Sequence, residues 1–291
     1  MHKQDRLQIL RKPEWLKIKI GHGSEFREVQ EQIRSNGLNT ICTSGDCPNK
    51  YECWSRGTAT IMILGNICTR HCKFCNVDPG RPLPPDPNEH IKVANSIRAL
   101  KLKHCVLTSV DRDDLPDFGA GHWAKTITEI KLRNPDITIE GLIPDFNGHN
   151  DFTQIVIDAE PNVISHNLET TRSLTPKLRS KAKYDTSLNV LSYIANSKII
   201  AKSGIMVGVG ETEEEVFQTM DDLLNVGVKV MTIGQYLQPT LSHYPVIEYV
   251  HPDQFAKYKE IGLQKGFQYI ESGPLVRSSY FAENHINVKL K

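Results

Sequence analysis

The sequence has almost no excess charge of either sign, since 35 Lys and Arg residues stand against 34 Asp and Glu residues. This balance argues against a nucleic-acid polyanion as the main partner. The chain also lacks any apolar run near the ~18 residues that a membrane span needs. Its basic opening segment contains Asp5 and Glu14 and little serine, which makes it a poor organelle transit peptide. These absences predict a soluble, cytoplasmic protein.

Internal repeats and low-complexity tracts are also absent, apart from a recurring strand–helix unit that starts near residue 59. Helical periodicity is expected from an N-cap at Asp86 with Pro87 in the first turn, and again around Trp123, Leu188 and Val216. The six expected strands are Ala59–Leu64, Cys105–Val110, Ile137–Leu142, Asn162–Leu168, Gly204–Gly208 and Lys229–Leu237.

Six strand–helix units predict a parallel sheet with right-handed crossovers. Six are too few to close an eightfold barrel, so the expected fold class is α/β, a partial (β/α)6 TIM-type barrel. A helix after Ser24, with Phe26, Val29 and Ile33 on one face, is expected in an N-terminal extension. In such a barrel, functional residues gather at the carboxyl ends of the strands.

Six of the seven cysteines form two groups of three, and each group lacks the fourth ligand of a closed metal site. The first triad is Cys42, Cys47 and Cys53, with C-x4-C-x5-C spacing. The second triad is Cys68, Cys72 and Cys75, with C-x3-C-x2-C spacing, directly after the first expected strand. Three thiolates that hold a four-iron cluster leave one iron open to another ligand. Two such clusters point to redox or radical chemistry.

Simpler interpretations of the cysteines stay open. Structural zinc uses the same residue type but favours paired cysteines that close to four ligands, which would have to be borrowed from both triads. Disulfides fit less well, because the cysteine count is odd and no apolar signal segment precedes the triads. The seventh cysteine, Cys105, lies in an apolar run and is expected to be a small buried hydrophobe.

Several segments together resemble a known family. The loop Cys68-Thr69-Arg70-His71-Cys72-Lys73-Phe74-Cys75 resembles the radical S-adenosylmethionine superfamily. The resemblance narrows to lipoyl synthase through the residues around the first triad, S-V-D-R-D-D-L after the second strand, H-N-L-E-T after the fourth, and Arg277-Ser278-Ser279-Tyr280. It runs from Lys12 to Tyr280. Another sulfur-inserting radical enzyme, a methylthiotransferase or a biotin-synthase-like protein, is the alternative, although the first triad and R-S-S-Y argue against both.

The resemblance implies an enzyme that inserts two sulfur atoms, at the sixth and eighth carbons, into an octanoyl chain on a lysine of a lipoyl carrier domain. The second triad would hold a 4Fe–4S cluster whose open iron binds S-adenosylmethionine, which serves hydrogen abstraction from C–H bonds that acid–base catalysis cannot break. The first triad would hold a sacrificial auxiliary 4Fe–4S cluster that donates sulfide. A ferredoxin- or flavodoxin-type reductant and an iron–sulfur carrier are the other implied partners.

The resemblance also suggests roles for individual residues. Ser279 would complete the auxiliary cluster, with Ser278 as second choice. Only one of the two can be the ligand, because neighbours in an extended segment point to opposite faces. Alternatively, both serines only cap a turn. Expected contacts to S-adenosylmethionine are Asp111, Asn167, Glu169 and Gly208. Each has a plainer interpretation as a charged turn, a buried polar pair or an ordinary glycine.

Three other residues and the division of the chain complete these expectations. His71 is expected to be a spacer, and His243 and Arg277 receive no role. The chain is expected to have three parts. Residues 1–58 form an N-terminal extension with the first triad, and residues 59–270 form the barrel. Residues 271–291 form a C-terminal segment that closes over the auxiliary cluster.

Overall fold

The computed structural model describes residues 10–18, 24–56, 58 and 60–287. Its strands are β1 (Asn39–Thr40), β2 (Thr60–Ile63), β3 (Ile67–Cys68), β4 (Asp78–Pro79), β5 (His104–Ser109), β6 (Thr138–Leu142), β7 (Val163–Ser165), β8 (Ile200–Val207), β9 (Val230–Gln235) and β10 (Tyr269–Gly273). Its α-helices are α1 (Ser24–Ser35), α2 (Ile41–Ser44), α3 (Lys50–Ser55), α4 (Glu89–Ala99), α5 (Ala120–Arg133), α6 (Asn150–Asp158), α7 (Thr175–Leu178), α8 (Tyr184–Ala195), α9 (Glu213–Asn225) and α10 (Pro252–Lys265). Short 3-10 helices are η1 (Glu14–Leu16), η2 (Phe146–Gly148) and η3 (Ala282–Asn287).

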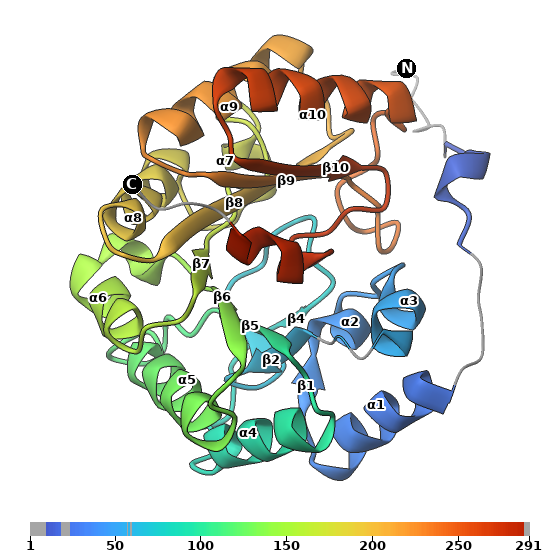
Figure 1. The fold of residues 1–291 in the computed structure, drawn as a ribbon. Helices are drawn as coiled ribbons and strands as arrows, with labels where there is room; N and C mark the ends of the chain where they lie inside the picture. Colours follow the sequence, from blue (N-terminus) through green and yellow to red (C-terminus); the bar gives the residue numbers. More distant parts are fainter. Residues whose placement is uncertain (1–9, 19–23, 57, 59, 288–291) are drawn as a thin grey trace, which may run out of the picture.

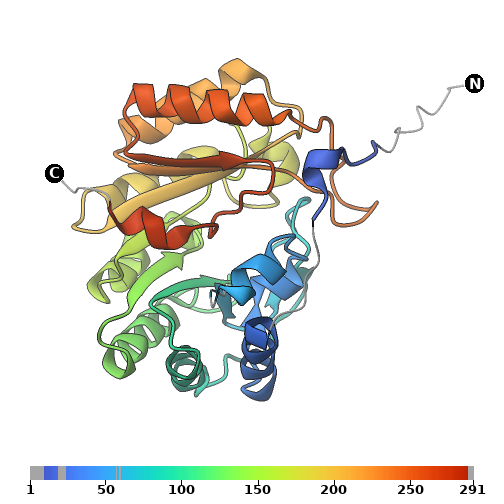
Figure 2. The same cartoon turned by 45° about the vertical axis from the view of Figure 1, so that its right-hand side comes forward.

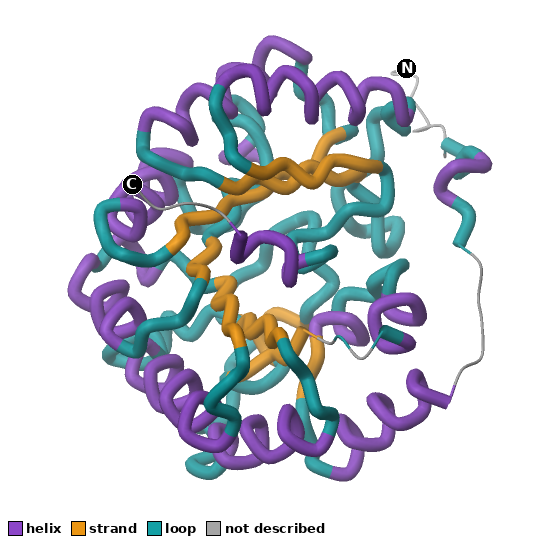
Figure 3. Tube along the Cα trace, viewed as in Figure 1, coloured by secondary structure: helices purple, strands orange, loops and turns teal. Residues whose placement is uncertain are grey.

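The main sheet is a partial barrel. Its order is β1-β2-β5-β6-β7-β8-β9-β10, and every pair from β2 to β10 is parallel. Only β1 pairs antiparallel, on the outer side of β2. The strands form an inner arc and the long helices an outer ring, while β1 and β10 remain the two edges of the sheet (Figure 1, Figure 3). The expected α/β partial barrel is confirmed.

The apolar periodicity of the sequence locates the helices that cover the sheet. Trp123, Ile127 and Ile130 of α5 are completely buried, as are Val216 and Met220 of α9. α9 starts with a capping box, in which the side chains of Thr212 and Glu215 each accept from the other residue's backbone N–H. Burial of one face, rather than intrinsic helix propensity, therefore stabilises these helices.

The predicted N-cap at Asp86 is wrong. The helix begins at Glu89, with Asn88 at the N-cap. The Asp86 carboxylate instead accepts from the Asn88 backbone N–H at 2.9 Å and pairs with Lys92 Nζ at 2.6 Å. The side chain that fits a helix start therefore closes the turn immediately before it.

The strand limits and number also differ from expectation. The first expected strand residue, Ala59, lies outside the described residues. β7 ends at Ser165 rather than residue 168, because the chain bends until Glu169 rejoins β8 as an isolated bridge to Ile205 with φ 69°. β8 begins four residues before the predicted Gly204. A seventh parallel strand, β10, was not expected, because Tyr-Ile-Glu-Ser-Gly has little β-branched or apolar character.

The N-terminal extension and the C-terminal segment meet at the open side of the barrel (Figure 2). Asn49 Nδ2 donates to the Leu275 carbonyl at 2.6 Å, and the Tyr280 hydroxyl donates to Glu52 at 3.1 Å. The Arg56 guanidinium lies over the Phe281 ring at 4.3 Å. Segments more than 220 positions apart in the sequence are therefore joined by direct contacts.

The expected helix after Ser24 is α1, on which Val29 and Ile33 are buried and Phe26 stacks on Trp54 with a centroid distance of 5.1 Å. This small core packs α1 against α3 and against the cysteines of the first triad. Across the described ranges, no helix is long and apolar enough to cross a membrane.

Candidate active site

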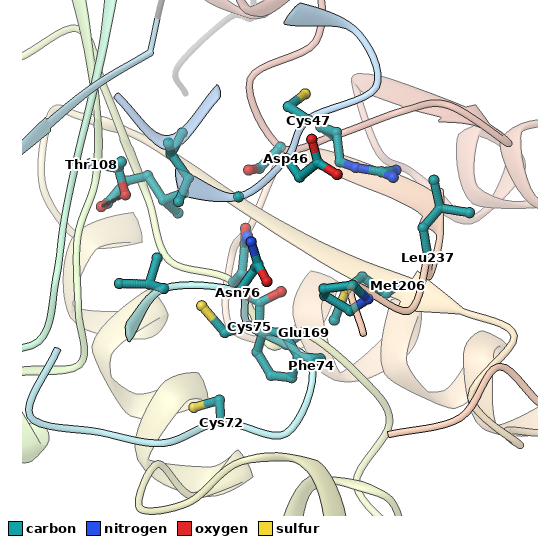
Figure 4. A pocket seen from close by; sticks show the side chains of 18 of the residues that line it. Asp46, Cys47, Cys72, Phe74, Cys75, Asn76, Thr108, Glu169, Met206 and Leu237 are labelled. Atoms are coloured by element: carbon teal, nitrogen blue, oxygen red, sulfur yellow. Dashed lines mark hydrogen bonds between the residues drawn. The ribbon is translucent and has the colours of Figure 1, made fainter. Parts of the chain in front are cut away.

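A cavity of about 870 Å³ opens at the carboxyl ends of the barrel strands. Residues at or just after the ends of five strands line it, as does the loop of the second triad: Ser109, Leu142, Asn167, Met206, Gln235 and Cys68. Cys47 of the first triad lines the same cavity. In the view of Figure 4, Cys47 lies on one side and Cys72 and Cys75 on the other, with Glu169 next to Cys75. One cavity therefore connects the two triads.

The loop of the second triad is held by backbone contacts. Cys68 Sγ accepts from the backbone N–H groups of Arg70 and Asp111, both at 3.4 Å. The Lys73 backbone bonds to Leu178 at 2.8 Å and to Tyr244 at 2.9 Å. Burial raises the pKa of Cys68 to about 11 and that of Cys75 to about 12. Both thiols are partly buried. With pKa values this high they need a nearby cation to become thiolates, and iron of a cluster would supply it.

Arg70, inside the cluster loop, joins this loop to two strand ends. Its guanidinium donates to both carboxylate oxygens of Asp113 at 2.9 Å and to Asp145 at 2.7 Å, and lies 3.4 Å from Asp111. The expected charged loop at residues 111–114 is therefore not a solvated turn, since its carboxylates pair with arginines. The role of Arg70 was missed, although an arginine between two cysteines and acidic residues after the second strand were visible signals.

Three of the four expected cofactor contacts line the large cavity. Asp111 Oδ2 lies 3.8 Å from Cys68 Sγ. Asn167 and Glu169 line the cavity beside it, and burial raises the pKa of both Asp111 and Glu169. Gly208 is not among the lining residues that the structure describes: its N–H donates to Glu211 at 2.5 Å, and a Cβ there would lie 2.2 Å from Gln235 Nε2.

Buried polar atoms in the cavity lack partners. Asn167 Oδ1 and Arg179 Nε are both buried and make no hydrogen bond. Arg179 also donates from Nη1 to the Asn167 carbonyl at 3.1 Å. A polar ligand with both donors and acceptors, such as S-adenosylmethionine, would satisfy both atoms. Sequence reasoning missed Arg179, which lies after α7 outside any recognised motif.

The first triad lines a second, small cavity, which shares Cys47 and Arg277 with the large one. Cys42, Cys47, Cys53 and Ser279 all contribute to it. Burial raises the pKa of Cys53 to about 12, and the neighbouring thiols Cys47 and Cys42 raise it further. Cys42 is buried and Cys47 and Cys53 are partly buried, and three thiols that line one cavity favour a cationic partner that stabilises all three as thiolates. The donor set therefore suits an iron–sulfur cluster.

Neither cavity is arranged for a single metal ion. No group of three or more His, Cys, Asp or Glu side chains is close enough to bind one in the ranges described above. A four-iron cluster differs, because each thiolate binds a different iron. The small cavity has a volume of about 20 Å³, little more than a water molecule requires.

Ser278 and Ser279 face different surroundings. Ser279 Oγ lies 2.9 Å from Thr60 Oγ1 and lines the small cavity with the first triad. Ser278 lines the large cavity instead, and its carbonyl accepts from Lys202. The expected extended segment is wrong: Tyr280 N–H donates to the Arg277 carbonyl at 2.9 Å, which closes a turn. The two serines nonetheless point to different sites.

The remaining expectations concern single residues. Cys105 is completely buried in the core, as expected. His71 is exposed on the cluster loop. His243 Nε2 lies 3.0 Å from the Cys75 carbonyl, so this histidine supports the loop of the second triad. Arg277 donates to the carbonyls of Gln235 and Val276 at 3.2 and 2.7 Å and lines both cavities.

Comparison with known proteins identifies the family. Residues 62–223 match the model of the radical SAM superfamily. Lipoyl synthase of Bacteroides thetaiotaomicron is 62% identical over 277 residues, which are 95% of this chain and 98% of that protein. The chain belongs to the lipoyl synthase family. Lipoyl synthases of Phocaeicola vulgatus and Treponema denticola are 61% and 60% identical, over 96% and 95% of this chain and 99% and 95% of theirs.

Solved structures share the fold at much lower identity. Methylornithine synthase (PylB) has a TM-score of 0.56 at 12% identity, covering 86% of this chain and 79% of its own. The maturase HydG from Carboxydothermus hydrogenoformans has a TM-score of 0.57 at 12% identity, covering 89% and 76%. Lipoyl synthases are radical SAM enzymes that use S-adenosylmethionine and 4Fe–4S clusters. This family membership argues against structural zinc at the triads and favours lipoyl synthase over the methylthiotransferase and biotin-synthase-like alternatives.

Proposed function

We propose that this member of the lipoyl synthase family inserts two sulfur atoms, at the sixth and eighth carbons, into an octanoyl chain attached to a lysine of a lipoyl carrier domain. The observation that carries the proposal is the single large cavity lined by cysteines of both triads. A substrate chain in this cavity would lie between the group that removes hydrogen and the group that supplies sulfur. The two steps can then follow one another without release of the chain.

The second triad is assigned to the cluster that binds S-adenosylmethionine. Cys68, Cys72 and Cys75 would hold three of its irons, and Asp111, Asn167 and Glu169 would contact the cofactor. Their support is that all six residues line the large cavity. Gly208 would support the cofactor site by allowing Gln235, which lines the large cavity, to approach β8 closely.

The first triad and Ser279 are assigned to the auxiliary cluster. Their support is the small cavity that Cys42, Cys47, Cys53 and Ser279 share. Serine oxygen is a harder ligand than a thiolate and suits soft iron–sulfur centres less well. Such a ligand can leave readily when the cluster gives up sulfide. Because the cluster is consumed in this step, it acts as a substrate of the reaction.

When bound, the cofactor and the clusters supply hydrogen-atom abstraction from unactivated C–H bonds and sulfide for insertion. The chain itself supplies position and protection. Met62, Val77 and Tyr236 give the cavity apolar walls that suit an alkyl chain and exclude water. Arg70 holds the loop of the second triad against the strand ends, so its three sulfurs keep their positions relative to the cavity.

The partners and location follow from the same assignment. An octanoylated carrier domain is the macromolecular substrate, a small ferredoxin- or flavodoxin-type protein is the reductant, and an iron–sulfur carrier rebuilds the consumed cluster. All cysteines in the described ranges are unpaired, which supports a reducing, cytoplasmic location. The functional parts are residues 1–58, 59–270 and 271–291, whose contacts across the open side of the barrel support the closing role of the last part.

Anaerobic reconstitution tests the reaction. The purified chain is loaded with iron and sulfide and mixed with S-adenosylmethionine, a reductant and an octanoylated carrier domain. Loading should reach about eight irons and eight sulfides per chain, for two clusters. Mass analysis of the carrier should then show two added sulfur atoms on the octanoyl group. Consumption of S-adenosylmethionine without any change in carrier mass would refute the proposed substrate.

Substitutions of the two serines test the ligand. Ser279→Ala should leave the auxiliary cluster labile and stop sulfur insertion. Ser279→Cys should keep the cluster but slow sulfur transfer, because a thiolate leaves iron less readily. Ser278→Ala is the matched control and should retain activity. Activity that survives both Ser279 substitutions but is lost in Ser278→Ala would transfer the ligand role to Ser278.

A further inference from the structure

A buried ion pair crosses the barrel interior beside the turn that carries Ser279. Lys202 of β8 and Glu140 of β6 have fully buried side chains, with Nζ 2.6 Å from Oε1. Ser165 of β7 donates its hydroxyl to the same carboxylate oxygen at 3.0 Å. Transfer of two charges out of water costs several kcal/mol per ion, and apolar side chains of similar volume often stabilise a core equally well. A purely structural role therefore does not explain the pair.

Lys202 also makes a contact outside the sheet. Its Nζ donates to the Ser278 carbonyl at 2.5 Å, across 76 positions of sequence. Burial opposes ionisation of Glu140, but the neighbouring Lys202 ammonium lowers its pKa to about 2, whereas burial lowers the pKa of His285 and favours a neutral ring. Glu140 is therefore a carboxylate at neutral pH, and its Oε1 accepts from the Lys202 ammonium group at 2.6 Å.

The Ser278 carbonyl belongs to the peptide group between Ser278 and Ser279, so its direction defines the orientation of that peptide in the turn. The Tyr280 N–H donates to the Arg277 carbonyl, so Ser278 and Ser279 occupy the two central positions. Neither serine has a positive φ. A flip of the peptide between them would reverse the carbonyl and require a positive φ at Ser279, as in a type II turn. The bond from Lys202 therefore selects one of two turn conformations.

The residue that follows this peptide, Ser279, lies at the first triad. Ser279 Oγ lies 2.9 Å from Thr60 Oγ1 and lines the small cavity with Cys42, Cys47 and Cys53. A peptide flip changes the backbone angles of Ser279 and so the direction of its side chain. The orientation of the Ser278 carbonyl and the direction of the Ser279 hydroxyl are therefore coupled.

Glu140 makes a second contact with the C-terminal segment. Its Oε2 lies 3.8 Å from Nδ1 of His285, and both side chains are fully buried. His285 belongs to η3, which follows the turn directly, and its ring packs on Tyr269 of β10 with a centroid distance of 4.9 Å. The ion pair thus contacts the C-terminal segment on both sides of Ser279.

We propose that Lys202 is a positioning residue for the auxiliary cluster: its ammonium group, oriented by Glu140, fixes the Ser278 carbonyl and so directs the Ser279 hydroxyl at the first triad. This inference rests on the proposed role of Ser279 as a cluster ligand. Lys202 touches neither the cluster cysteines nor the substrate cavity in the described contacts. It acts through the backbone alone.

The test separates positioning from stability with a double substitution. Lys202→Met with Glu140→Leu removes both charges and fills their space with apolar groups, so the barrel should stay folded. The bond to the Ser278 carbonyl is lost. After anaerobic reconstitution, iron should fall from about eight to about four per chain. Mössbauer spectra should show the remaining iron as the second-triad cluster, and cleavage of S-adenosylmethionine should persist.

Controls decide what each result means. Lys257→Met with Glu213→Leu removes an ion pair on the surface, where Nζ and Oε1 are 2.7 Å apart, and should keep all iron. Ser279→Ala in the same assay tests the ligand itself. If Ser279→Ala loses auxiliary iron but the Lys202 double variant does not, the positioning role is overturned and the ligand role stands. If Ser279→Ala keeps all iron, the ligand role fails and the positioning role fails with it.

A second double variant keeps the proposal testable if the first one does not fold. Lys202→Met with Glu140→Gln keeps an acceptor for Ser165 and should fold where the apolar variant does not. Selective loss of auxiliary iron in this variant supports the proposal. Equal loss of iron from both clusters, or failure of both double variants to fold, would make the pair purely structural and overturn it.

Discussion

Arg70→Met tests how the loop of the second triad is fixed. The Arg70 side chain is 3% exposed, and Asp145, one of its partners, is 2% exposed. In the variant Asp145 would remain in the interior without a counter-charge, whereas Asp113 would keep Lys181 at 3.2 Å. Removal of one partner from a buried ion pair costs about 3–5 kcal/mol. For a chain of this length, the apparent Tm should fall by roughly 5–15 °C.

The pH dependence of stability tests the same ion pair independently. Burial opposes ionisation of Asp145, but the hydrogen bond to Arg70 and its charge lower the pKa to about 2. The ionised pair therefore contributes stability that is complete above about pH 4, the usual range of an unfolded aspartate. This stability is lost as the pH falls through 2. The depression corresponds to roughly 2–3 kcal/mol, a large share of the expected loss.

The measurement is anaerobic thermal unfolding of the parent and the variant at matched iron content, from pH 7 down to pH 3. The difference in Tm should shrink as the pH falls, because Asp145 takes up a proton in the variant before it does so in the parent. Arg172→Met is the control: Arg172 pairs with Asp185 at 2.5 Å, both side chains are more than half exposed, and the expected loss is under about 1 kcal/mol. A similar small loss for Arg70→Met would refute the reasoning.

Three further predictions concern the cysteines, the stoichiometry and the C-terminal turn. Cys72→Ala should abolish cleavage of S-adenosylmethionine, whereas Cys47→Ala should leave cleavage measurable and stop sulfur insertion; lipoyl product from Cys47→Ala would exclude the donor role of the first triad. Without cluster repair, each chain should make about one lipoyl group and use about two S-adenosylmethionine molecules for it, and many turnovers with an intact auxiliary cluster would contradict this. Gly234→Ala should displace the C-terminal segment, because its Cβ would lie 2.1 Å from the Val276 carbonyl oxygen, at a cost of about 1–3 kcal/mol; auxiliary iron, measured per chain, should fall, and unchanged iron would show that the segment adapts.

The sequence predicts the barrel well because its helices and strands carry regular apolar patterns. Trp123, Ile127 and Ile130 repeat at helical spacing and are all buried on α5. β10 escaped prediction because its polar residues lie at the edge of the sheet, where only one neighbouring strand pairs with it. The first residue of a helix such as α4 depends on which side chain in the preceding turn accepts a backbone N–H; here Asp86 accepts from Asn88. The apolar pattern of the sequence does not determine this.

For the site, residues in recognisable motifs were predictable and residues defined by long-range contacts were not. The cysteine spacings identify two triads but not that one cavity is lined by both. Arg179, Lys202 and Glu140 belong to no motif with a known chemistry, and their importance follows only from burial and distances. For Gly208 the structure adds a packing reason for glycine, since a Cβ there would meet Gln235 Nε2 at 2.2 Å, and its contact with the cofactor stays a prediction.

The bond between Thr60 and Ser279 spans 219 positions, which has a consequence for biosynthesis. A growing polypeptide emerges from the ribosome with its N-terminal side first, at about 5–20 residues per second. The three cysteines of the first triad are exposed for roughly 10–40 seconds before Ser279 is made. Iron delivered during this interval would meet three thiols without their oxygen ligand. Delivery of the auxiliary cluster should therefore follow release of the chain, whereas the backbone contacts that hold the second-triad loop are complete once Tyr244 has been made.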